Sequence, residues 1–128
     1  MMIRLIAVVG LLVAAPSAAG AQDVAAGEKS FNKCRACHQV GETAKNTVGP
    51  ILNGLFGRKS GTIEGYNYSD ANKNSGIIWD DKVFAEYIAD PKGKIPGTKM
   101  SFAGIKKDDE IKDLTAFLMQ FGADGKKK

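Results

Sequence analysis

The residues with the clearest chemistry are two cysteines followed by a histidine. Cys34, Cys37 and His38 form a Cys-x-x-Cys-His sequence, which accounts for both cysteines and the one histidine of the 128-residue chain. This spacing is that of a c-type haem attachment site. Two thiols three positions apart can each reach one vinyl group of the same porphyrin, and the adjacent imidazole then falls on the iron. The sequence therefore predicts one covalently held haem c with His38 as an axial ligand.

Two other kinds of site use closely spaced cysteines, and each needs features that this chain lacks. A structural zinc site would require further Cys or His ligands, and the sequence has none left to supply them. A thioredoxin-like redox pair would lie near a βαβ pattern, but no alternating strand runs occur here. Haem attachment is therefore the favoured interpretation.

A second axial ligand has to be a methionine or a lysine, or be absent, because no second histidine exists. Of the two methionines beyond residue 21, Met119 lies among apolar residues of an expected helix, where packing explains it. Met100 follows Pro96 and Gly97 in a loop whose irregular backbone can direct a side chain sideways. We expect Met100 to bind the iron, since a thioether ligand raises the redox potential.

The elements expected to position these residues are short helices separated by glycine-bearing loops, which predicts an all-α fold. Apolar periodicity, capping residues and proline positions indicate four of them. In chain order, the expected helices run from Asp23 to the cysteines, from Ser69 or Asp70 to near Gly76, from Asp80 to before Pro91, and from Asp108 to Gly122.

Gly27 lies inside the first expected helix, where it costs about 1 kcal/mol relative to alanine. A close crossing with the last helix would explain it, with Leu114 and Phe117 opposite and Phe31 beside them. A tolerated surface glycine is the alternative. The third helix is expected to face inward with Tyr87.

The N-terminus has the pattern of a cleaved secretory signal peptide. A short positive start ending at Arg4 precedes an apolar run from Leu5 to Ala15 that is too short to span a bilayer. Small residues at Ala19 and Ala21 then match a signal peptidase site, so we expect cleavage before Gln22 and a periplasmic protein. An uncleaved membrane anchor is the alternative. Residues 22–128 then form a single domain whose apolar core is marginal, so that the haem completes it.

The chain resembles the class I cytochromes c, including mitochondrial cytochrome c and the bacterial cytochromes c2, from Gly27 to Phe121. The matching segments are residues 48–50 (Val-Gly-Pro), 54–59 (Gly-Leu-Phe-Gly-Arg-Lys), 68–74 (Tyr-Ser-Asp-Ala-Asn-Lys-Asn) and 95–107. This resemblance implies the class I cytochrome c fold, in which the N-terminal and C-terminal helices cross and short helices surround one haem.

The resemblance also implies roles for residues around the haem. Pro50 matches the residue whose carbonyl fixes the proximal histidine, here His38. Tyr87 matches the tyrosine near the methionine sulfur, and Phe102 matches the aromatic residue beside the exposed haem edge. Residues that match the binding site of the buried propionate and its internal water network are Arg58, Tyr68, Trp79, Asn72 and Thr98. Plain core packing is the alternative for Trp79 and Tyr87.

An iron with six filled positions has no place for oxygen, peroxide or substrate, so the expected function is one-electron transfer and not catalysis. The implied donor is a cytochrome bc1 complex, and the implied acceptor is a photosynthetic reaction centre or a terminal oxidase. A haem-based peroxidase or gas-binding protein is the alternative if Met100 is not a stable ligand. A structural subunit of a larger complex is a further alternative to the expected monomer.

Charge indicates the kind of partner, because the chain has a formal net charge of +4. By resemblance, a set of lysines surrounds the exposed haem edge and steers the protein to acidic docking surfaces. Scattered solubilising lysines are the alternative. Nucleic-acid binding is not expected, and contact with a membrane surface would be transient. The tail after Gly125 is expected to be disordered. The lysines are Lys33, Lys45, Lys92, Lys94, Lys99, Lys106 and Lys107.

Overall fold

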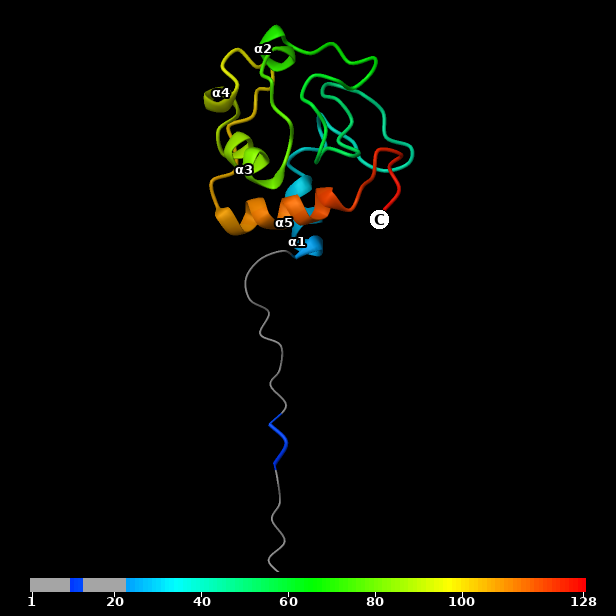
Figure 1. Cartoon of the computed structure of the whole chain (residues 1–128), viewed down its shortest axis with the longest axis vertical. Helices are drawn as coiled ribbons and strands as arrows, with labels where there is room; N and C mark the ends of the chain where they lie inside the picture. The colour runs from blue at the N-terminus through cyan, green and yellow to red at the C-terminus, as the bar shows by residue number, and fades with distance from the viewer. Residues whose placement is uncertain (1–9, 13–22) are drawn as a thin grey trace, which may run out of the picture.

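The structure, a computed structural model, describes residues 10–12 and 23–128. The elements in this part of the chain are five helices and two isolated bridges, with no strands (Figure 1), which confirms the predicted all-α class. The predicted signal peptide and its cleavage site fall mainly in residues 1–9 and 13–22, outside the described residues. No described helix has the length and apolar character needed to cross a membrane. The helices are α1 (Val24–Phe31), α2 (Asp70–Lys73), α3 (Asp81–Ala89), α4 (Pro91–Lys94) and α5 (Asp108–Met119).

The first and last helices begin where the sequence predicts and end earlier. The Asp23 carboxylate caps α1 by accepting from two backbone amides. After Phe31 the backbone tightens into i to i+3 hydrogen bonds, such as Cys34 N to Phe31 O at 2.8 Å, so the cysteines lie on turns beyond the helix. Helix α5 likewise ends at Met119, not at Gly122, whose amide donates instead to Lys126 O.

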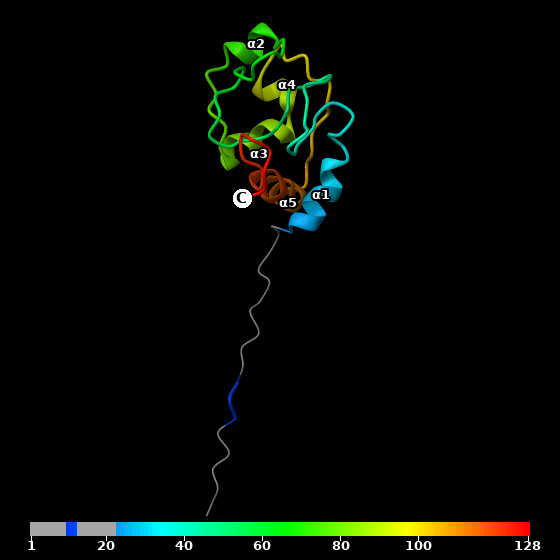
Figure 2. The ribbon, with the colours of Figure 1, turned by 90° about the vertical axis from the view of Figure 1, so that its right-hand side faces the viewer.

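Gly27 allows α1 and α5 to cross closely (Figure 2). A Cβ at this position would lie 2.0 Å from Asp113 O and 2.8 Å from Phe117 Cβ, so only glycine fits. Phe31 packs beside the crossing, with its ring centroid 5.3 Å from that of Phe117. The predicted crossing of the terminal helices is confirmed.

The middle helices match the prediction in part. Helix α2 begins after Ser69 as expected but ends at Lys73, before Gly76. Helix α3 is capped by Asp80 and ends before Pro91, as predicted. Helix α4 was not predicted. It begins at this same proline, whose fixed φ and missing N–H suit the first position of a helix as well as the end of one.

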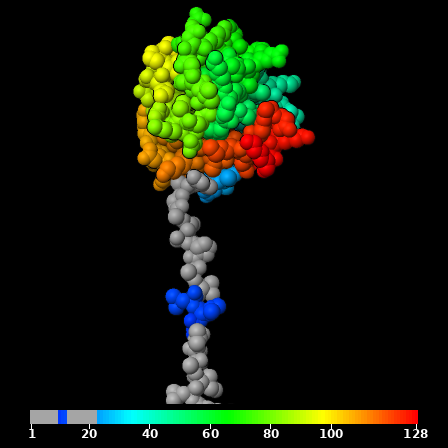
Figure 3. Space-filling model, in the orientation of Figure 1, coloured from blue at the N-terminus to red at the C-terminus, as the bar shows by residue number. Residues whose placement is uncertain are grey.

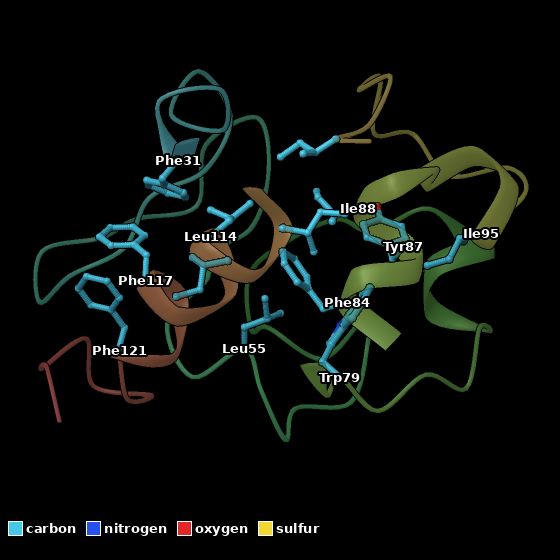
Figure 4. Close-up of a cluster of buried hydrophobic side chains, with 13 residues drawn as sticks. Phe31, Leu55, Trp79, Phe84, Tyr87, Ile88, Ile95, Leu114, Phe117 and Phe121 are labelled. Atoms are coloured by element: carbon cyan, nitrogen blue, oxygen red, sulfur yellow. The ribbon is translucent and has the colours of Figure 1, made fainter. Parts of the chain in front are cut away.

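The core is one cluster of buried side chains that contains two groups of packed aromatic rings (Figure 4). One is an aromatic cluster at the α1–α5 crossing, where Phe117 is 5.3 Å from both Phe31 and Phe121. The other is formed around α3, where the Tyr87 ring meets Trp79 edge-on at 5.0 Å. Tyr87 is only 7% exposed, which confirms that α3 faces inward with this residue.

The C-terminal tail is folded, so the expectation of disorder was wrong. Phe121 and Lys127 form an antiparallel bridge, and Lys128 N donates to Gln120 O at 2.8 Å. Gly125 is buried at a φ of +79°, a conformation that glycine adopts without strain. Composition indicated a charged tail and gave no sign of these backbone hydrogen bonds.

Candidate haem-binding site

The attachment segment lies on turns immediately after α1. Cys37 N and His38 N both donate to Cys34 O, at 3.1 and 2.9 Å. Both thiols are free and half-buried. Burial raises the pKa of the Cys34 thiol to about 11, so the thiol is protonated at neutral pH.

His38 is held by the loop that follows it. Its Nδ1–H donates to Pro50 O at 2.8 Å, which leaves Nε2 as the nitrogen with a free lone pair. Burial lowers the pKa of His38, so the neutral imidazole that a metal requires is favoured. Gly49 packs closely against the His38 ring, because a Cβ at residue 49 would lie 2.4 Å from His38 Cε1. This role of Gly49 was not predicted, because a glycine's neighbour in space is not visible in its sequence context.

Met100 lies in the loop between α4 and α5. The Tyr87 hydroxyl donates to Met100 Sδ at 3.0 Å, as the resemblance implied for this pair. Burial raises the pKa of Tyr87, and the Thr98 hydroxyl opposes that shift. The Thr98 oxygen also accepts from Met100 N at 3.3 Å. The sulfur is therefore held by a tyrosine on α3 and by its own loop.

A single cavity of about 460 Å³ brings these residues together. Its walls include apolar side chains from α3, α5 and the loop at residue 55, namely Phe84, Leu114, Leu118 and Leu55. All the residues predicted for the haem site line it: Cys34, Cys37, His38, Pro50, Arg58, Tyr68, Asn72, Trp79, Tyr87, Thr98, Met100 and Phe102. A flat apolar ring with polar edges fits such a lining.

The polar edge of the cavity is built around Arg58. Its Nη1 donates to Ile51 O at 3.2 Å and to Asn53 O at 3.1 Å, and burial lowers its pKa. In the described part of the chain the ion pairs are Lys33–Glu110 and Lys94–Glu86, so Arg58 has no carboxylate partner from the protein there. The half-buried guanidinium therefore faces the cavity with its charge available to an anionic group there.

Two further polar residues lie at this edge. Tyr68, 9% exposed, accepts from Ile63 N through its hydroxyl at 3.1 Å. Ser60 Oγ donates to Asn72 Oδ1 at 2.7 Å. Ser60 is a buried residue that the sequence analysis missed, because an isolated serine in a loop carries no pattern.

Lys33 and Lys99 are the two predicted docking lysines that line the cavity. Lys33 pairs with Glu110. Lys99 Nζ lies 4.6 Å from the Tyr66 ring centroid and donates to Asn67 O. The remaining predicted lysines are exposed, and among them Lys94 pairs with Glu86 at 2.6 Å.

Comparison with known proteins agrees with this geometry. The profile of the family described as cytochrome c matches residues 24–122. A cytochrome c2 from Blastochloris viridis is 63% identical over 123 residues, covering 94% of this chain and 97% of that protein. A cytochrome c-550 from Bradyrhizobium diazoefficiens is 68% identical over 104 residues, covering 81% of this chain and 76% of the relative.

A solved structure shows the same fold. Cytochrome cH from Methylobacterium extorquens aligns with a TM-score of 0.72 at 47% identity, covering 77% of this chain and 98% of that one. Its fold, the family match and the cavity lined by a Cys-x-x-Cys-His segment point the same way. The chain belongs to the cytochrome c family of electron carriers, with the all-α class I fold and one covalently bound haem c.

Proposed function

We propose that the protein is a one-electron carrier whose haem is attached through Cys34 and Cys37, with His38 and Met100 as the two axial ligands. The observation that carries this proposal is that one cavity is lined by a histidine fixed by Pro50 and a methionine fixed by Tyr87. When bound, haem supplies a one-electron Fe(III)/Fe(II) couple, and histidine with methionine raises its potential.

The protein's part in this function is to hold the two ligands. Pro50 accepts the Nδ1–H of His38, which orients the ring and increases the basicity of Nε2. Tyr87, on α3, holds the sulfur of Met100 through its hydroxyl. Because both ligands are held before an electron arrives, little rearrangement is needed between the two oxidation states.

The remaining cavity residues would bind the rest of the ring. Arg58 supplies a half-buried positive charge that takes part in no ion pair of the described residues, and Tyr68 and Trp79 line the same cavity, which supports propionate binding there. Asn72 and Thr98 would complete the polar network. Phe102 would cover the haem edge.

The alternative, a peroxidase or gas-binding protein, needs Met100 to leave the iron. The hydrogen bonds that Met100 receives and makes, from Tyr87 and to Thr98, favour retention of the sulfur. Electron transfer is therefore the function that the geometry supports best.

We further propose secretion to the periplasm with residues 1–21 removed, and transient docking of a monomer to acidic partners. A cytochrome bc1 complex would be the donor, and a reaction centre or terminal oxidase the acceptor. The exposure of Lys92, Lys106 and Lys107 supports this kind of surface, whose attraction would weaken with salt. N-terminal sequencing of the secreted protein tests the cleavage before Gln22.

Absorption spectroscopy tests the ligand assignment. The purified ferric protein should show the weak far-red band of methionine-bound haem, and the reduced protein should not bind carbon monoxide. Met100→Ala should abolish the band, whereas Met119→Ala, 42% exposed on α5, should retain it. A five-coordinate resting state in the unmodified protein would refute the proposed function.

A further inference from the structure

The C-terminal residues 120–128, here named the C-terminal turn, form a closed unit. Gly122 N donates to Lys126 O at 3.0 Å and Gly125 N donates to Gly122 O at 2.9 Å. Lys126 N donates to Asp124 Oδ1 at 2.9 Å, and the Phe121–Lys127 bridge joins the two ends. The unit therefore has a defined conformation and presents a fixed surface to its neighbours.

The C-terminal turn packs against the loop of residues 39–54 (Figure 3). A Cβ at Gly125 would lie 2.1 Å from Gly41 O and 2.8 Å from Asn53 Nδ2. From the other side, a Cβ at Gly54 would lie 2.9 Å from Ala123 Cα, and Gly54 N donates to Phe121 O at 3.1 Å. Gly125 in the turn and Gly54 in the loop thus allow the two backbone segments to pack in direct contact.

The loop beneath Gly125 is cross-linked by one buried side chain. Asn53, 6% exposed, accepts from Gly41 N at 2.9 Å and donates to Gly41 O at 2.8 Å, so it ties the two ends of the loop together. Its backbone oxygen also accepts from Arg58 Nη1 at 3.1 Å. Pro50 lies inside this tied loop. The contact at Gly125 is therefore connected, through Asn53 and its loop, to the Pro50 carbonyl that binds His38 and to the backbone oxygen that binds Arg58.

We propose that the C-terminal turn is a brace for the 39–54 loop, and that Gly125 is a positioning residue that acts through Asn53 on Pro50 and Arg58. This inference rests on the proposed ligation by His38. With the brace in place, the loop keeps the Pro50 carbonyl on His38 and keeps water away from the cavity edge. Without it, the loop moves outward, and the added solvent favours the more highly charged ferric state, which lowers the potential.

The first test is Gly125→Ala in the haem-containing protein, with Gly76→Ala as the matched control. Both glycines have positive φ, +79° and +70°, but a Cβ at Gly76 meets nothing within 4 Å. Gly125→Ala should lower the equilibrium constant for reduction at least threefold, about 28 mV at about 59 mV per tenfold. Gly76→Ala should leave the potential unchanged. Equal shifts in the two variants would overturn the proposal, since backbone strain alone would then explain them.

A second variant separates the backbone of the turn from its charge. Lys126→Gln, Lys127→Gln and Lys128→Gln together remove three charges and keep the backbone contacts. If the turn acts as a brace, the reduction potential of this triple variant should stay close to that of the unmodified protein. A shift as large as that of Gly125→Ala would assign the effect to electrostatics and refute the brace.

Native-state hydrogen exchange on the unmodified protein keeps the proposal falsifiable if Gly125→Ala does not fold. The amides of Gly125 and Lys128 in the turn and of Gly41 and Gly54 in the loop should exchange through one shared opening. If the turn amides exchange at least tenfold faster than that of Gly41, the turn opens alone and the proposal is wrong. This coupling is measured independently of the axial ligands, so its failure is distinguishable from failure of the proposed function.

Discussion

Replacing both attachment cysteines, Cys34→Ala with Cys37→Ala, is expected to give a haem-free chain that is largely unfolded. The magnitude follows from the cavity of about 460 Å³. At about 24 cal/mol per Å³, a dry cavity of that size costs about 11 kcal/mol. Native domains are stable by only about 5–15 kcal/mol, so this cost removes most or all of the margin. Water entering the cavity would lower the cost but would also solvate apolar walls such as Leu55 and Phe84.

Far-ultraviolet circular dichroism measures the result. The haem-free double variant should lose most of the helical signal of the haem-containing protein and should unfold without a cooperative transition. Addition of free haem should restore part of the signal, because the predicted stabilisation comes from packing as well as from the covalent bonds. Native helix content and cooperative unfolding without haem would refute the reasoning.

Three further predictions concern single residues. Gly49→Ala should push the His38 ring from Pro50 and destabilise the protein by about 1–3 kcal/mol in denaturant unfolding. Gly27→Ala should separate α1 from α5 and cost about 1–3 kcal/mol in the same assay, despite its better helix propensity. Lys33 and then Ser30 hold the pKa of Glu110 below its ordinary 4.5, so their contribution is present above that pH and is lost as the pH falls further. Glu110→Gln should therefore reduce stability by up to about 1 kcal/mol at pH 7, and the difference measured by urea unfolding should shrink as the pH is lowered below 4.5.

Haem attachment could be predicted from the sequence because it is encoded by residue types at fixed spacing. Cys34, Cys37 and His38 are neighbours in the chain, so their chemistry needs no knowledge of the fold. Met100 was predicted as a ligand because it is one of only two methionines beyond residue 21 and because it lies in an irregular loop. The residues of the polar edge came from the family resemblance, and the structure brings them into the same cavity.

The contacts that the sequence analysis missed are those between backbone segments. Gly49 against the His38 ring and Gly125 against Gly41 both depend on the absence of a side chain, and a glycine in a loop reads as a simple turn residue. Helix ends were also uncertain for a physical reason. At Phe31 and Met119 the backbone changes to i to i+3 hydrogen bonds, and neither residue differs from an ordinary helical one.

The lysines show why composition alone is a weak guide to a docking surface. Several predicted docking lysines bind other residues of the chain at the surface: Lys33 pairs with Glu110, Lys94 pairs with Glu86, and Lys106 donates to Ala89 O. Such a partner restrains the side chain, and a carboxylate partner also cancels much of the charge that an acidic protein would feel. Lys45, Lys92 and Lys107 are exposed, and no ion pair of the described residues includes them. Long-range attraction therefore depends more on these three lysines than their share of the predicted set suggests, because an uncompensated charge contributes most to the field outside the molecule.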